Sequence, residues 1–567
     1  MGGVDRMARV GGVGNAAGGP KSPAIVHTAI AFGMTILLAV FALSARQPSP
    51  PAATELFPQP LEQIEDAPEE QASEFGEGAG GSGGVGQDQL SPETGEDASI
   101  EVPRVRRCVG DPPRQTEDPK SPPCVPYFEG DNGGATWRGV TANEIKVAWP
   151  ELVIFEDRMV MAAMLAHFNS RYEFYGRKIT LEPFEPRDGF YATPNPSNMQ
   201  ADAVHVDEEM SAFASISYAA RFGAEHHYYD ELARRQILSI AHRASAIATE
   251  ARYQGFDPYQ WNTQPSIDIM MRIYGEFVCK SLNDRAPRHA GPPINSQPER
   301  VFGMIVGEQT DGTTPPIGIF KQVLSGCGVE LAAEFRQRES LDSAERAQSS
   351  TAAIAAMSQS TPQVTSVICW CDVSNVRDGL MVSASSQGYQ PEWLLSTYID
   401  NDVDNSFRNT SPEQAAHVIG VSWRDKWLQN PDTSWWAAMK EGAPGYTPGD
   451  NQGYSMNARY QSLLMLASGI QLAGPRLTPQ AFRDGLLQAT FANPGAGGPP
   501  YYQAAMGFPG GRHTLTSSGT MIYYDRAAPA TVERGERGAV CYVDRGIRYD
   551  LGNWPTAEPR FYEGPCT

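Results

Sequence analysis

Two adjacent histidines mark the stretch of the chain that most resembles a metal-binding site. The run EHHYYD, from Glu225 to Asp230, places them between carboxylates. Zinc is commonly bound by histidine, but two ligands on one helix usually stand four residues apart. Neighbouring helical residues point about 100° apart, so these two rings are not expected to hold one ion easily. The pattern favours a half-exposed helix surface, and we predict no metal site.

Other chemical motifs are weak. Asp400, Asp402 and Asp404 alternate in DNDVDN and could offer oxygens to calcium, but the glycine and the distal glutamate of an EF-hand loop are missing. The chain has no H-E-x-x-H and no Walker A loop. A Ser/His/Asp constellation is spatial, so it stays open. The motifs predict a protein that is not an enzyme and needs no cofactor.

Eight cysteines follow the apolar N-terminal stretch described below. An even number favours disulfides in an oxidising compartment. Cys108 with Cys124 and Cys541 with Cys566 are close in sequence and are the first candidate pairs. Metal ligation is the alternative, but no histidine pair lies nearby at zinc-ligand spacing. The disulfide candidates are Cys108, Cys124, Cys279, Cys327, Cys541 and Cys566, while Cys369 and Cys371 stand two apart on an expected strand and share a face.

The net charge of −21 is concentrated in one segment. Between residues 47 and 103 there are thirteen acidic residues and no lysine or arginine. Setting these aside leaves about −8 for the rest of the chain, which is ordinary for its size. No basic stripe offsets the acid, so a nucleic-acid partner is not indicated.

Residues 24–45 contain no charged side chain and are long enough to cross a hydrocarbon core of about 30 Å. Arg6, Arg9 and Lys21 precede them, so the positive-inside rule predicts a cytoplasmic tail, residues 1–23, and an extracytoplasmic remainder. A cleaved signal peptide is the alternative, but the apolar stretch exceeds the usual length of about 7–15 residues. We expect a single-pass transmembrane anchor.

Residues 46–135 are rich in proline, glycine, glutamate and serine and include EGAGGSGGVG. Few large apolar residues are present to offset the entropy of ordering the chain. We expect a disordered acidic linker here. The glycines of GDNGGAT, at residues 130–136, precede the first expected strand, whereas a phosphate-binding loop follows one. They mark the N-terminal boundary of a folded domain that we expect over residues 136–567.

From residue 136 onward, apolar strands alternate with helices. IKVAW is strand-like, FEDRMVMAAMLAHFNSRY helical, RKITLEPFE strand-like, and the alternation continues to PEWLLSTYI at residues 391–399. Such alternation predicts mostly parallel sheets covered by helices on both faces. A stretch of this length exceeds one ordinary domain, so two α/β lobes are expected.

The ordered set of these segments resembles the type I periplasmic-binding fold, in the Leu/Ile/Val-binding branch of ABC-transporter solute receptors. GVTANEIKVAW looks like the family's first strand, ELARRQILSIAHRAS like its third strand and ligand loop, and RVFGMIVGEQ like the first strand of the second lobe. YQSLLMLASGIQLAGPRLTPQAFRDGLLQATF looks like its late helix pair. The resemblance runs from about residue 128 to 550.

This resemblance implies an α/β, two-lobed Venus-flytrap that closes on a ligand. Lobe 1 would comprise about residues 136–262 and 425–510, and lobe 2 about residues 263–424 and 511–567. Candidate ligand residues lie in the loops after strands: Trp149, Glu151, Ser217, Tyr218, Arg221, His242, Arg243 and Ser245 in lobe 1, and Glu308, Gln309, Asp372, Asn375, Tyr398 and Asp400 in lobe 2.

By the same resemblance, Ser217 would help to hold a ligand carboxylate and Asp400 would meet an ammonium. Arg243 could pair with a carboxylate through two hydrogen bonds. The loop SIAHRASA around Arg243 departs from the small Ala/Thr-rich turn usual in the family.

The sequence therefore predicts a membrane-anchored extracytoplasmic receptor that captures a small polar, amino-acid-like ligand for an ABC importer. The alternative is a receptor-like sensor or cell-surface scaffold that keeps the fold without transport. The expected partners are a small-molecule ligand, an ABC-transporter permease and the membrane, reached through the N-terminal helix.

Overall fold

A computed structural model describes residues 106–567, apart from residues 112, 153–155, 191, 244, 450–451, 492–505 and 567. The predicted anchor at residues 24–45 and the acidic stretch up to residue 105 lie outside the described residues. Within the described ranges, no helix combines the length and the apolar character needed to cross a membrane.

The folded part begins earlier than residue 136. Two short strands, β1 (Cys108–Val109) and β2 (Arg114–Gln115), pair antiparallel, and the Cys108–Cys124 disulfide closes the loop that contains β2. The Gln115 side chain is fully buried and donates to the carbonyl of Arg171, 2.9 Å away. Residues 106–135, here called the N-terminal arm, were thus wrongly assigned to the linker. A disulfide and buried polar contacts order a stretch that is poor in apolar residues.

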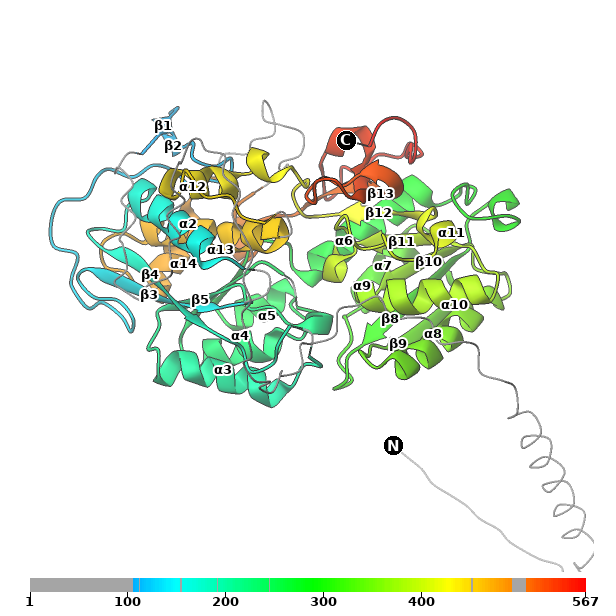
Figure 1. Cartoon of the computed structure of the whole chain (residues 1–567), viewed down its shortest axis with the longest axis horizontal. Coiled ribbons are helices and arrows are strands. Elements are labelled where there is room, and N and C mark those ends of the chain that lie inside the picture. The colour runs from blue at the N-terminus through cyan, green and yellow to red at the C-terminus, as the bar shows by residue number, and fades with distance from the viewer. Residues whose placement is uncertain are drawn as a thin grey trace, which may run out of the picture. The chain divides into compact units, whose positions relative to one another are not determined.

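The first lobe is built on a five-stranded parallel sheet in the order β4-β3-β5-β6-β7 (Figure 1). Its strands are β3 (Glu144–Pro150), β4 (Lys178–Phe184), β5 (Ala214–Ile216), β6 (Leu238–Ala241) and β7 (Gln260–Asn262). Period-two alternation sends Ile145, Val147 and Trp149 to one core and Ala148 to the other.

Helices cover both faces of this sheet (Figure 1). On one face lie α2 (Arg158–Arg171), α12 (Ser434–Gly442), α13 (Gly453–Ala473) and α14 (Pro479–Gln488). On the other lie α3 (Pro196–Glu208) and α4 (His226–Arg234), and the short α5 (Glu250–Gly255) precedes β7. Helix α2 begins at a preferred N-cap residue, because the Asp157 carboxylate accepts hydrogen bonds from two backbone amides of its first turn.

The second lobe repeats the strand order and extends it. Its sheet runs β14-β13-β12-β11-β10-β8-β9; β8 to β12 are parallel, β13 and β14 antiparallel, and β15 pairs with β13. The strands are β8 (Phe302–Glu308), β9 (Leu331–Arg338), β10 (Ser366–Trp370), β11 (Glu392–Ser396), β12 (Val418–Ser422), β13 (Ser518–Pro529), β14 (Arg537–Tyr542) and β15 (Tyr549–Asp550).

Again two cores flank the sheet. Met304 and Val306 of β8 face the core that contains α6 and α7, whereas Ile305 faces the core under α8 and α10. These helices are α6 (Ile267–Phe277), α7 (Gly318–Gly326), α8 (Ser343–Ser358), α9 (Val373–Asn375), α10 (Met381–Ser386) and α11 (Pro412–Ala415).

The chain passes between the lobes three times, after β7, after β12 and before β13. At the first and third crossings Asn262 bridges Thr514, and the amide of Leu515 donates to the Asn262 carbonyl at 3.0 Å. The segment after β12, residues 423–433, is called the crossing segment below. Each lobe is therefore assembled from separate stretches of chain.

All eight cysteines are paired. The bonds are Cys108–Cys124, Cys279–Cys327, Cys369–Cys371 and Cys541–Cys566. Both short-range pairs expected from the sequence are present, and the two cysteines on a shared strand face are joined to each other.

Candidate functional site

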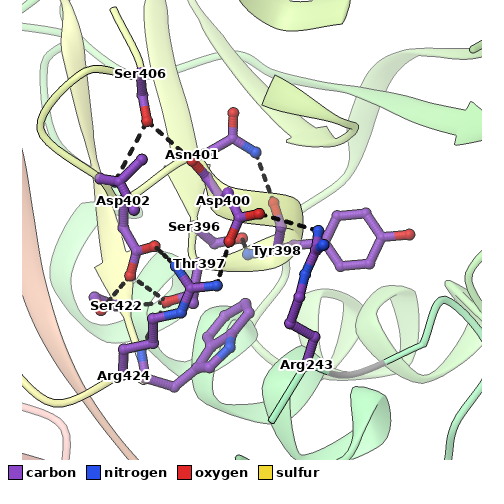
Figure 2. A network of polar contacts seen from close by, with 12 residues as sticks. Arg243, Ser396, Thr397, Tyr398, Asp400, Asn401, Asp402, Ser406, Ser422 and Arg424 are labelled. Carbon is purple, nitrogen blue, oxygen red and sulfur yellow. Dashed lines mark hydrogen bonds and ion pairs between the residues drawn. The ribbon is translucent and has the colours of Figure 1, made fainter. Parts of the chain in front are cut away.

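The carboxyl ends of the two sheets meet in an ion pair between the lobes. Arg243, in the loop after β6, places Nη2 3.0 Å from Oδ2 of Asp400 in the second lobe (Figure 2). Asp400 ends a tight turn, Tyr398–Asp400, that follows β11. Ile399 and Asp400 both have positive φ, 46° and 63°, and this turn aims the carboxylate at the first lobe. Both charged residues belong to the ligand set predicted from the sequence.

A second guanidinium approaches Asp400 from the crossing segment. Arg424 Nη2 donates to Asp400 Oδ1, and its Nη1 lies 3.0 Å from Asp402 Oδ1 (Figure 2). Burial alone would raise the pKa of Asp400, but the charges of Arg243 and Arg424 hold that pKa well below its ordinary value. Asp400 is therefore an ionised carboxylate held between two cations.

Asp402 supports this arrangement from beneath. The hydroxyls of Thr397 and Ser422 donate to its Oδ2 at 2.8 and 2.6 Å (Figure 2). Further along, Asp404 accepts the backbone amides of residues 531, 532 and 540 at 2.7, 3.0 and 3.1 Å. All three carboxylates of DNDVDN therefore accept hydrogen bonds or pair with arginines of the protein itself.

A second cross-lobe contact forms at Arg221. Its Nη2 donates to Ser374 Oγ at 3.0 Å and lies 3.6 Å from Asp372 Oδ1. Asp372 caps α9 and is fully buried, and its Oδ2 has no hydrogen-bond partner among the described residues. The adjacent buried Glu339 accepts the Asp372 amide, and burial together with the Asp372 charge raises the pKa of Glu339 well above its ordinary value. Arg221 therefore faces an acidic pocket of the second lobe.

A third contact closes the rim. Gln309 Nε2 donates to the carbonyl of Phe222 at 2.7 Å, and His227 Nε2 lies 3.1 Å from Asp311 Oδ2. A cavity of about 10 Å³ lies here between the lobes, lined among others by these four residues. That volume holds about one water molecule. The lobes touch directly in this closed arrangement.

Four predicted ligand residues face into the first lobe instead. Trp149 donates to Glu156 Oε2 at 2.8 Å, and Glu151 pairs with Arg158 at 2.6 Å. Ser217 Oγ contacts Ser462 Oγ, and the Tyr218 hydroxyl donates to Asp202 at 3.0 Å. In this arrangement the Ser217 hydroxyl is paired with Ser462 and does not point toward a ligand carboxylate between the lobes.

The reason is a buried arginine that the sequence analysis missed. Arg459 of α13 is 2% exposed and lies across the ends of β3 and β5. Its Nε donates to Glu156 Oε1 at 2.6 Å, and its other nitrogens donate to the carbonyls of Pro150 and Ile216 at 2.6 and 3.2 Å. In sheets of this strand order ligands bind where neighbouring connections leave in opposite directions, between β3 and β5. Arg459 fills that point, and nothing in its helical surroundings signals this from sequence.

The remaining predicted residues surround the ion pairs. His242 Nδ1 lies 2.7 Å from Thr263 Oγ1; burial and the nearby Arg424 charge lower the pKa of His242 to about 3. Ser245 Oγ donates to the Gly223 carbonyl at 3.0 Å. Asn375 accepts the Ser340 amide at 3.4 Å. Tyr398 is buried against Trp370, and Glu308 is half-buried at the end of β8.

Besides Arg459, sequence reasoning missed Arg424, Glu225 and Glu339. Glu225 lies 3.7 Å from Arg243, and burial raises the pKa of its carboxyl. Arg424 could have been found by extending the same rule, residues after a strand, to β12.

A separate cavity of about 50 Å³ lies where the N-terminal arm meets the crossing segment. Lys120 of the arm pairs with Asp425 and donates to Gln461 Oε1 at 3.0 Å. Lys120 is 5% exposed, so an arm residue is built into the junction of the lobes. The cavity wall includes Asp118, Lys120, Asp425, Lys426, Trp427, Asn430, Asp432, Asn457 and Gln461.

Comparison with solved structures identifies the fold. A substrate-binding protein of an ABC transporter from Aeropyrum pernix is 12% identical, with 72% of this chain and 96% of that chain covered and a TM-score of 0.50. A branched-chain amino acid ABC transporter protein from Thermus thermophilus with bound valine is 11% identical, with 72% and 96% covered and a TM-score of 0.46. A solute-binding protein of an ABC transporter from R. palustris, in complex with 4-hydroxybenzoate, is 9% identical, with 73% and 99% covered and a TM-score of 0.49.

Sequence comparison finds no protein-family model and no curated protein that matches this chain. The Aeropyrum pernix protein carries the conclusion: the described chain has the two-lobed fold of ABC-transporter solute-binding proteins, as the resemblance implied.

Proposed function

We propose that this chain is a solute-binding receptor whose lobes close on a small polar, amino-acid-like molecule. One observation carries the proposal. Arg243 and Asp400, of opposite charge and from opposite lobes, meet at the facing ends of the two sheets. Open α/β sheets bind ligands at this edge, and lobe closure is the motion that such an architecture supports.

The mechanism follows from the charges. When the lobes part, Arg243 loses Asp400 and keeps only contacts in its own lobe, with Glu225 3.7 Å away, while Asp400 still has Arg424 beside it. A zwitterion entering between them replaces one ion pair by two, its carboxylate on Arg243 and its ammonium on Asp400. Because Nη2 of Arg243 and Oδ2 of Asp400 lie only 3.0 Å apart, an amino acid does not fit between them, so the ligand-bound closure must be less complete than the arrangement described here.

The location belongs to the same proposal. We infer that residues 24–45 anchor the chain in a membrane, with the N-terminus cytoplasmic and the lobes outside. Four disulfides fit an oxidising extracytoplasmic compartment. The partner would then be the permease of an ABC importer, to which the closed receptor delivers its solute.

A second candidate function is a tethered sensor or surface scaffold. The direct cross-lobe contacts favour it, since Arg243, Arg221 and Gln309 all find partners without a solute. In that case the closed form is the resting form, and a solute acts by opening it.

A thermal-shift screen of the purified full-length chain against amino acids, short peptides, amides and sugars tests capture. A ligand present at 100 times its Kd stabilises the folded state by about 2.7 kcal/mol. We expect a hit among zwitterions that is lost in Arg243→Met and kept in Arg234→Met, an exposed arginine of α4 that pairs with Glu231. No hit in any class, or a hit indifferent to Arg243→Met, would overturn the proposed site.

Transport is tested separately. Under the importer proposal the receptor co-purifies with a permease, and deleting it abolishes uptake of the identified solute. A solute that binds while uptake continues unchanged in the deletion strain would support the sensor or scaffold.

A further inference from the structure

Two histidines of the first lobe and an aspartate of the second converge at the edge of the interlobe contact. His226, His227 and Asp311 each offer a ligand atom, and these atoms lie within 4.8 Å of one another. The proposed solute site uses none of the three, so what they do is a separate question.

The two histidines are adjacent at the start of α4, where the sequence predicted divergent rings. Instead their ring centroids are 4.0 Å apart, with an interplanar angle of 38°. Each ring is held by a different neighbour: His226 Nδ1 lies 3.1 Å from Ser245 Oγ, and His227 Nε2 lies 3.1 Å from Asp311 Oδ2. With these contacts one ligand atom of each histidine and of Asp311 lies within 4.8 Å of the other two, so the two rings are closer together than the helical spacing suggests.

Asp311 is presented by a tight turn. The Gln309 amide donates to the Thr313 carbonyl, and the Gly312 amide donates to the Gln309 carbonyl, both at 2.9 Å. Asp311 Oδ1 accepts the Thr313 amide at 2.9 Å, which leaves Oδ2 toward His227. The carboxylate is thus oriented before any ion arrives.

Two imidazoles and one carboxylate form a zinc-type donor set. Mg²⁺ and Ca²⁺ prefer oxygen ligands alone, whereas Zn²⁺ takes nitrogen and oxygen in a tetrahedron and leaves a fourth position for water. Ligands at about 2.0–2.1 Å from zinc lie roughly 3.3 Å from one another, close to the 3.1 Å between His227 and Asp311. The eight cysteines are all in disulfides and offer no competing thiolate.

We propose that His226, His227 and Asp311 bind Zn²⁺ across the two lobes and that the ion stabilises the closed arrangement. Zinc binds more tightly when the lobes touch, because only then are all three ligands together. By linkage, the metal shifts the population toward closure by the ratio of its two affinities. The proposal goes beyond solute capture, since it assigns a metal that regulates the motion.

The test is a zinc titration of the purified, untagged full-length chain without added solute. Isothermal calorimetry should give one site for wild type, and small-angle scattering should report a smaller radius of gyration with ZnCl₂. His227→Ala and Asp311→Asn should each weaken binding at least tenfold and remove the compaction, and MgCl₂ and CaCl₂ should produce neither effect. His205→Ala is the matched control, because His205 also pairs with a carboxylate, Glu209, at 3.2 Å on a helix surface.

Equal zinc affinity in wild type and His227→Ala would overturn the site. Zinc binding that survives Asp311→Asn would overturn the bridge between the lobes. Melting temperatures without metal check that each variant is folded. Because the titration uses no solute, its failure would leave the proposed receptor function untouched, and failure of the solute screen would leave the zinc site untouched.

Discussion

Arg243 and Asp400, which lie far apart in the sequence, join the two lobes through a contact of 3.0 Å between Nη2 and Oδ2. Asp400 is also held by Arg424, so it stays positioned when the lobes separate, whereas the other contacts of Arg243 lie in its own lobe. Arg243 is therefore the member of the pair that senses closure.

Replacing Arg243 with methionine should open the lobes. The substitution keeps an apolar stem but removes the charge, and truncating one partner of a hydrogen-bonded ion pair at an interface costs about 2–5 kcal/mol. We expect a larger radius of gyration by small-angle scattering. The control is Arg234→Met, which removes an exposed arginine that pairs with Glu231 of the same helix. Identical scattering from wild type and Arg243→Met would show that other contacts hold the lobes.

The stability of the protein should fall in mild acid partly because of His242. Burial and the charges of Arg424 and Lys120 lower its folded pKa to about 3, against the opposing effect of Asp425 and Asp400. The unfolded histidine binds a proton below about pH 6.5 and the folded one does not, so acid favours unfolding between about pH 6.5 and about pH 3. The slope from this group is at most about 1.4 kcal/mol per pH unit. Urea titrations across this range should show a shallower dependence in His242→Asn; an unchanged slope would contradict the assignment.

Arg459→Met should be strongly destabilising. It leaves the Glu156 carboxylate buried without its cation and three backbone carbonyls without their donor. Breaking a buried ion pair from one side costs about 3–5 kcal/mol. Equilibrium unfolding should show that loss, and the double variant Arg459→Met/Glu156→Gln should recover part of it. Equal stabilities of single and double variants would argue against the pair as the cause.

Lys120→Ala should release the N-terminal arm from the crossing segment. The substitution removes the partner of Asp425 and a donor to Gln461 in a nearly buried position, a loss of about 1–3 kcal/mol. Limited proteolysis should then cleave within residues 106–135 faster than in wild type. Lys178→Ala, at an exposed lysine of β4, serves as the control. An arm that stays resistant to protease in Lys120→Ala would mean that the disulfide and Gln115 hold it without this contact.

The layers of the fold could be predicted from the sequence, because apolar strands such as IKVAW and FGMIV alternate with helical segments. Which side chains occupy the carboxyl ends of the strands could not be predicted from the sequence. Arg459 lies far along the chain from Ser217, and no local pattern announces that it occupies the end of β5. The loops of Arg221, Arg243, Gln309, Asp372 and Asp400 were found because position after a strand is a local property.

The N-terminal arm and the histidine pair also could not be predicted, because contacts with distant residues decide their structure. Residues 106–135 have the composition of a linker, and only distant partners such as Arg171 and Asp425 order them. His226 and His227 diverge on an ideal helix, and only Ser245 and Asp311 bring their rings together. In both cases long-range contacts override a correct local argument.

The interleaving of the lobes constrains how the protein is made. The first lobe takes β3 to β7 from residues 144–262 but needs α12 to α14, which end at Gln488, to bury its core. A chain emerging from a ribosome therefore exposes an incomplete first lobe while the whole parallel part of the second is being synthesised. The second lobe in turn awaits β13 and β14 and the Cys541–Cys566 bond. Neither lobe can bury its whole core until nearly all of these residues are available, and a chain that ends before α13 leaves both cores incomplete.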